Sequence, residues 1–147
     1  MNGFELGNDG PTIIVVGIDG SPTSMRAGAY AAGLARRQGA ELLVVHVVGG
    51  MAMAGLVPGA IGVVEATLDE NAEQIAKQVE WGAEHAGVRA QFRSARGDAF
   101  TELSRIADEV RADAVVVGAS ASAGHRIVGS LAVRLVRAGR WPVTVVP

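Results

Sequence analysis

Two short segments carry the residues best suited to binding a ligand. The first, 17–22 (Gly-Ile-Asp-Gly-Ser-Pro), places Asp19 directly after an apolar run and before Ser21 and Pro22. Ser-Pro favours a helix start, because serine caps the first turn and proline fits its first position. The unpaired N–H groups and the dipole at such a start suit an anion. Two interpretations of Asp19 stay open: it accepts hydrogen bonds from a ligand's ribose or amino group, or it only caps this helix.

The second segment, 118–130, is built mainly of glycine, alanine and serine and delivers Gly129 and Ser130 to the start of a predicted helix. Small side chains let the backbone approach a phosphate closely. Ser130 can cap the helix and also donate to an anion, while His125 and Arg126 add positive character. The alternative is a flexible surface loop with Arg126 solvated. The position between a buried strand and a helix favours binding.

Several catalytic motifs are incomplete in this chain. Residues 124–130 read G-x-x-x-x-G-S without the lysine of a phosphate-binding P-loop, and the only lysine is Lys77. No G-x-G-x-x-G follows the first apolar run, and Ser120 does not lie in G-x-S-x-G. The three histidines fall on different elements, and His46, inside an apolar run, is expected to pack in the core. No nucleophile–base pair or metal site is therefore predicted.

Composition narrows the class of protein further. The 147 residues fit one domain, 1–147, of which 1–12 is expected to be a flexible tail. There is no cysteine, the net charge is -2 and only 4% of residues are aromatic, so neither disulfides nor nucleic-acid binding is expected. No apolar stretch reaches the ~20 residues of a membrane helix, and no signal peptide is visible. We expect a soluble, cytoplasmic protein without a membrane partner.

Apolar runs separated by helical patterns position the two segments. Runs 13–18, 42–48, 114–117 and 143–146 are apolar throughout, which is typical of strands buried on both faces of a parallel sheet. Run 88–94 alternates and is expected at a sheet edge. Four stripes at helical spacing lie between the runs. The predicted helix ends are Gly39, Gly87 and Gly139, and the predicted caps are Ser21 and Asp98.

Alternating strands and helices predict right-handed crossovers and a mostly parallel sheet with helices on both faces. Segment 49–64 interrupts this regularity, since it has no charge and is long for a strand–helix connection. It is either a floppy insertion or an apolar lid over a ligand. The second helix is expected to begin after it, with Asp69, Glu70 and Glu73 in its first turn.

From residue 13 to residue 146 the chain resembles the universal stress protein family. The motifs that carry this resemblance are VVGIDGS (15–21), LVVHV (43–47), GD (97–98), ADAVVVG (112–118), VGS (128–130) and WPVTVV (141–146). The resemblance implies a three-layer α/β/α, Rossmann-like fold of the adenine nucleotide alpha hydrolase type. Its five-stranded parallel sheet has the order 3-2-1-4-5. It also implies a homodimer paired through 143–146, a strand whose bare apolar edge would otherwise invite uncontrolled pairing.

The resemblance also implies a binding site for ATP or another adenine nucleotide such as AMP. Asp19 would hold the ribose, the Val47 backbone the adenine, and Gly118, Gly129 and Ser130 the phosphates. The complete implied set is Ile18, Asp19, Gly20, Ser21, Val47, Gly118, Ala119, Ser120, Gly129, Ser130 and Leu131. The phosphate loop departs from the family pattern, because Ala121 replaces a glycine and the closing Gly-Ser comes two residues early.

Three functions follow from the resemblance and this departure. The first is a dimeric stress-response regulator that binds an adenine nucleotide. The second is a dimeric scaffold that has kept the fold and lost the ligand, as the shortened loop suggests. The third, weak ATP hydrolysis, ranks last, because no base, lysine or second Mg²⁺-binding acid accompanies Asp19.

Overall fold

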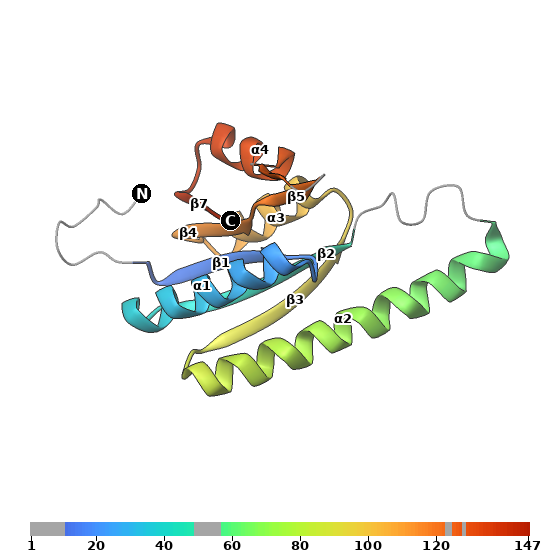
Figure 1. Cartoon of the computed structure of the whole chain (residues 1–147), viewed down its shortest axis with the longest axis horizontal. Helices are drawn as coiled ribbons and strands as arrows, with labels where there is room; N and C mark the ends of the chain where they lie inside the picture. The colour runs from blue at the N-terminus through green and yellow to red at the C-terminus, as the bar shows by residue number, and fades with distance from the viewer. Residues whose placement is uncertain (1–10, 49–56, 123–124, 128) are drawn as a thin grey trace.

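A parallel sheet of five strands forms the centre of the computed structural model, which describes residues 11–48, 57–122, 125–127 and 129–147. The strands are β1 (Ile13–Ile18), β2 (Glu41–Val48), β3 (Ala90–Arg96), β4 (Ala114–Gly118) and β7 (Val143–Val146). Their order is β3-β2-β1-β4-β7 (Figure 1), and all four pairings are parallel. The predicted order 3-2-1-4-5 is confirmed.

Four helices cover the two faces of the sheet. They are α1 (Pro22–Gln38), α2 (Pro58–Ala86), α3 (Ala99–Glu109) and α4 (Ser130–Ala138). Ala27 of α1 and Ile75 of α2 pack on one face, and Leu103 of α3 and Leu135 of α4 pack on the other. The middle strands are buried on both sides, as their unbroken apolar runs predict, so the three-layer fold is confirmed. None of the described helices combines the length and apolar character needed to cross a membrane.

Most helix ends lie where the sequence predicts them. Ser21 caps α1 by accepting from the Ser24 N–H, and Asp98 caps α3 by accepting from the Thr101 N–H. Gly39 ends α1 with φ +67°, in the left-handed region that glycine adopts without strain. The prediction for the last helix is wrong in one respect: its cap is Gly129, and Ser130 is its first residue.

Helix α2 begins earlier than the sequence suggests. The structure places 58–64 in its first turns, which corrects the prediction of a loop over 49–64; residues 49–56 lie outside the described part of the chain. Pro58 favours a helix start, but the uncharged residues after it show no apolar stripe. Asp69, Glu70 and Glu73 therefore lie within the helix, not in its first turn. Figure 1 shows α2 running beside β3, with its N-terminal turns beyond the sheet.

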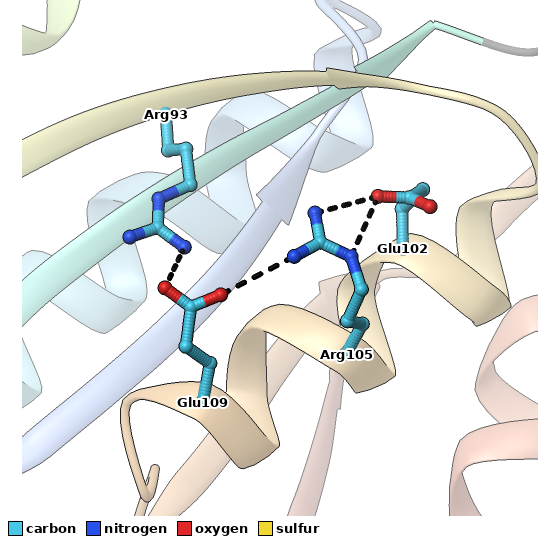
Figure 2. A network of polar contacts seen from close by, with 4 residues as sticks. All are labelled: Arg93, Glu102, Arg105 and Glu109. Atoms are coloured by element: carbon cyan, nitrogen blue, oxygen red, sulfur yellow. Dashed lines mark hydrogen bonds and ion pairs between the residues drawn. The ribbon is translucent and has the colours of Figure 1, made fainter.

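Ion pairs tie the edge strand β3 to the neighbouring helices. Arg96 pairs with Glu65 and Asp69 of α2 at 3.3 and 3.0 Å. On the other face, Arg93 reaches Glu109 of α3 at 3.1 Å and starts the network in Figure 2, in which Arg105 joins Glu109 to Glu102. The strand occupies the expected edge of the sheet but spans Ala90–Arg96, two residues later than the predicted run.

A two-stranded antiparallel ribbon follows β4. It is formed by β5 (Ser120–Ser122) and β6 (His125–Ile127), with Ser120 opposite Ile127. The sequence predicts a loop at this point, because serine and alanine have little preference for strands. The two strands of the ribbon lie within the second predicted binding segment, between β4 and α4 in the sequence.

Candidate functional site

A cavity of about 610 Å³ lies at the carboxyl ends of β1 and β4. β1 pairs with β2 on one side and with β4 on the other, and the sheet is extended in opposite directions from this pair of neighbours. The strand order therefore reverses between β1 and β4. Ligands of open α/β sheets bind at such a point. The volume is within the 300–1,000 Å³ range that is typical of small-molecule sites.

The cavity brings the two predicted binding segments together. Every residue of the predicted set except Gly20 lines it, including Asp19 from the first segment, Ser130 from the second and Val47 from β2. Gly20 instead forms the turn before α1, with φ +87°. Two segments that lie about 100 residues apart in the sequence thus line one cavity. The role of each residue toward a ligand stays a prediction.

Asp19 organises the turn between β1 and α1. Its Oδ1 accepts from the Ser21 N–H at 2.8 Å, and its own N–H donates to Ser24 Oγ at 3.2 Å. Ser24 Oγ in turn donates to the Ser21 carbonyl oxygen at 2.9 Å. The cap of α1 is Ser21, so the interpretation of Asp19 as the helix cap is wrong. Asp19 also lines the cavity.

The Asp19 carboxyl is ionised at neutral pH. Partial burial alone would raise its pKa, but hydrogen bonds from Ser21 and Ser24 outweigh this and hold the pKa below the usual 3.8. A charged carboxylate accepts strong hydrogen bonds from hydroxyl or amino groups. It also repels a nearby phosphate, so Asp19 is suited to the uncharged part of a ligand.

The start of α4 offers backbone donors to the same cavity. Gly129 caps the helix without a side-chain hydrogen bond, and no acidic residue lies in the first turn. The first N–H groups of a helix have no partner within it. Those of Ser130, Leu131 and Ala132 belong to residues that line the cavity. Together with the helix dipole they form a place suited to an anion.

Another part of the lining is apolar. Gly17, Val45, Val47, Leu103 and Val117 form it between the sheet and α3. Gly17 packs closely against α3, because a Cβ at this position would lie 3.3 Å from Cδ2 of Leu103. A flat, weakly polar group such as a nucleobase fits an apolar wall that has polar groups at one end.

His46 lies behind the site, on the opposite face of the sheet from Val47. It is buried beside Phe92, with ring centroids 6.4 Å apart, and its Nδ1 has no partner among the described residues. Burial lowers its pKa below 6.5, and the charge of Asp19 opposes this shift. The histidine is thus a neutral core residue, as predicted. The described residues contain no cluster of three acidic or histidine side chains that could hold a metal ion.

Sequence reasoning missed part of the lining, which includes Thr23, Ser24, Arg26 and Ala99 as well as the apolar residues Val45, Leu103 and Val117. Thr23 and Ser24 are buried against the end of β4, and Arg26 is the one guanidinium in the described lining. The sequence could have indicated the first four of these residues, because they lie in the first turns of α1 and α3 and those turns follow the ends of strands. Which side chains face the cavity depends on the tilt of each helix, which the sequence does not contain.

Comparison with known proteins assigns this chain to a family. The family model described as "Universal stress protein family" matches residues 11–147. A universal stress protein of Methanocaldococcus jannaschii is 29% identical over 136 residues, which cover 90% of this chain and 80% of that protein. A crystal structure of a universal stress protein family member from Burkholderia pseudomallei has a TM-score of 0.75 and 28% identity, covering 92% of this chain and 96% of that one.

A third relative carries a ligand. The crystal structure of a universal stress protein in complex with cAMP has a TM-score of 0.70 and 26% identity, covering 94% of this chain and 98% of that one. The family match spans both binding segments and every strand of the sheet. The chain therefore belongs to the universal stress protein family.

Proposed function

We propose that this protein is a dimeric regulatory module that binds an adenine nucleotide in the cavity between β1 and β4. The observation that carries the proposal is that one cavity is lined by three surfaces of different chemistry. These surfaces are an apolar wall that includes Val47, the ionised Asp19, and the start of α4 at Ser130. A nucleobase, a ribose and a phosphate need these three surfaces in turn.

A related structure supports the nature of the ligand. The universal stress protein that contains cAMP shares 26% identity and nearly the full length with this chain. An adenine ring, a ribose and a phosphate are common to cAMP, AMP and ATP. We propose ATP or AMP as the ligand. The described lining contains a single guanidinium and no lysine, which favours ligands with few phosphates.

The alternative function is a dimeric scaffold without a nucleotide. It is favoured by Ala121, which replaces a glycine of the family's phosphate loop, and by the shortened distance to Gly129. Catalysis is not part of the proposal, because the described lining contains no histidine and only one carboxylate, that of Asp19. At most, this lining would support weak ATP hydrolysis.

A homodimer through β7 and a cytoplasmic location complete the proposal. The strand lies at the edge of the sheet and is half-buried, and its sequence Val-Thr-Val-Val has no charge to discourage pairing. A second copy would cover this edge. A regulator that responds to adenine nucleotides needs access to the nucleotide pool of the cell interior, which is why we place it in the cytoplasm.

The first experiment is to identify what the purified protein carries. Protein isolated without added nucleotide is denatured, and the released small molecules are identified by mass spectrometry. Calorimetric titrations with adenosine, AMP, cAMP, ATP and GTP then measure affinity. Near-stoichiometric adenine nucleotide, or binding of adenine over guanine ligands, supports the module. Neither release nor heat with any of these ligands would contradict it and favour the scaffold.

A substitution at Gly129 tests the placement of the site. A Cβ there would lie 3.1 Å from the Ser120 Cβ, so Gly129→Leu narrows the cavity at the start of α4. We expect nucleotide binding to be lost while the dimer persists. Gly82→Leu on α2 is the matched control, since a Cβ at 82 meets nothing within 4 Å. Unchanged binding by Gly129→Leu would show that the site is misplaced.

A further inference from the structure

Arg26 joins the cavity to the far edge of the sheet. It lies in the second turn of α1, is exposed and lines the cavity. Its Nε donates to a main-chain oxygen of Pro147, the last residue of the sequence and directly after β7, at 3.0 Å. One side chain therefore touches both the proposed ligand site and the residue that follows the strand proposed to pair in the dimer.

The position of Arg26 is at the phosphate end of the proposed site. Residue 119, which lines the cavity, donates its N–H to the Val146 carbonyl oxygen at 2.7 Å, so Pro147 lies next to this part of the wall. Val47 lies on β2, on the other side of β1. The sheet order thus separates Arg26 from Val47 and places Arg26 on the side of the segment that leads to Gly129.

No Asp or Glu side chain pairs with Arg26 within the described part of the chain. Ion pairs bind other arginines to carboxylates, namely Arg93, Arg96, Arg105, Arg134 and Arg140. Arg26 has no such pair, and its single described hydrogen bond uses Nε alone. The main-chain oxygen of Pro147 holds the Nε side of the planar guanidinium. Both Nη groups, the side that can bind a phosphate with two hydrogen bonds, have no described partner.

We propose that Arg26, oriented by the main-chain oxygen of Pro147, makes the cavity select a ligand that carries a phosphate over the corresponding unphosphorylated nucleoside. This inference rests on the proposed function, since it assigns the charge selectivity of the same site. The backbone N–H groups at the start of α4 supply donors for the phosphate, and Arg26 supplies the full positive charge. Asp19, which would repel a phosphate, binds the uncharged part.

Titrations of four proteins test this selectivity: the wild type, Arg26→Gln, Arg26→Lys and Arg37→Gln. Arg37 is an exposed arginine in the last turn of the same helix and does not line the cavity, so its variant matches the change in net charge. The ligands are adenosine, AMP, ATP and inorganic pyrophosphate, at low and high salt. Circular dichroism and thermal unfolding check that each variant is folded.

We expect Arg26→Gln to weaken AMP and ATP binding about 10- to 100-fold and to leave adenosine within about twofold of the wild type. Arg26→Lys recovers part of the loss, because it keeps the charge without the fork. Arg37→Gln matches the wild type. The salt dependence of AMP binding shrinks in Arg26→Gln, a change that a purely structural role would not produce.

Three outcomes would overturn the inference. Arg26→Gln could bind AMP as the wild type does, it could weaken adenosine as much as AMP, or Arg37→Gln could show the same loss. A different result would contradict the proposed function and leave this inference standing. If the wild type binds pyrophosphate in an Arg26-dependent way but no adenosine or AMP, the charge selectivity stands and the adenine site does not. If the wild type binds none of the four ligands, both are wrong.

Discussion

Gly118, at the end of β4, lies against the backbone of Thr23 in α1. A Cβ placed on residue 118 would be 2.6 Å from the Thr23 carbonyl carbon and 2.8 Å from the Ser24 nitrogen. Both contacts are with backbone, which cannot rotate away as a side chain can. Glycine at 118 is therefore required for β4 and α1 to meet, whether or not a ligand occupies the cavity between them.

We predict that Gly118→Ala destabilises the protein by about 1–3 kcal/mol, because the added methyl group forces α1 away from β4. Urea denaturation followed by circular dichroism measures the loss. The control is Gly33→Ala in the middle of α1, where an added Cβ meets nothing within 4 Å. That variant is expected to gain about 0.5–1 kcal/mol from better helix propensity. Equal stability of Gly118→Ala and the wild type would contradict the packing argument.

Ionisation of Asp113 makes the free energy of unfolding depend on pH in the acid range. Its Oδ2 accepts from the Thr12 N–H, the Thr12 hydroxyl and the Ile13 N–H at 2.7–3.0 Å, which anchors the start of β1. Burial would raise its pKa, but these hydrogen bonds lower it below 3.8. A depressed carboxyl pKa stabilises the fold above the unfolded-state value, and this stability is lost as the pH falls through the folded-state value.

We therefore expect Asp113→Asn to be less stable than the wild type at pH 7, with a difference that narrows as the pH falls below about 3.8. Unfolding free energies measured between pH 7 and pH 2.5 show this convergence. Asp69→Asn, the same chemical change on the surface of α2, is the control for the loss of one negative charge. A constant difference at every pH would rule out ionisation of Asp113 as the source.

His46 makes the stability sensitive to weakly acidic pH. Because burial lowers its pKa below 6.5, the unfolded chain takes up a proton before the folded one does. The contribution of His46 to the free energy of unfolding is then fully present above pH 6.5 and falls as the pH drops toward the folded-state pKa. We predict that His46→Gln removes this part of the pH dependence. Unfolding free energies at steps from pH 7.5 to pH 5 give the slopes. His85→Gln, the same substitution at an exposed position on α2, is the control for the loss of an imidazole.

The elements that the sequence predicts well are those with a local cause. Strands such as β1 are apolar at every position because both faces of the sheet are covered, and α1 begins and ends with a serine cap and a left-handed glycine. The start of α2 was missed because 58–64 contain no charge to mark an outer face. The ribbon of β5 and β6 was missed because it is held by pairing between its own short strands, not by residues that prefer strands.

The candidate site was predictable in part for the same reason. Asp19 and Ser130 lie at strand and helix ends that the sequence marks, so their meeting at one edge follows from the topology. The role of Gly118 and the presence of Arg26 could not be predicted. Both depend on how closely α1 approaches β4 and β7, a distance set by the packing of the whole face.

Amide exchange at β7 tests the proposed dimer without changing the sequence. The Pro142 and Val146 carbonyls accept from β4, so the N–H groups of Val143 and Val145, which alternate with them, point away from the sheet. In a monomer these two amides face solvent and exchange quickly, whereas Thr144 and Val146 are protected by β4. If a second copy pairs along this edge, the Val145 amide gains a partner and slows.

We expect the Val145 amide to exchange about 10-fold or more slowly at high protein concentration than at dilutions that dissociate the dimer, as followed by residue-resolved NMR. The Thr144 amide is the internal control, because its partner on β4 is present in either state. Sedimentation velocity over the same dilution series gives the oligomeric state independently. A dimer in sedimentation with a rapidly exchanging Val145 amide would show that the two copies meet on another surface, since only pairing at the β7 edge protects this N–H.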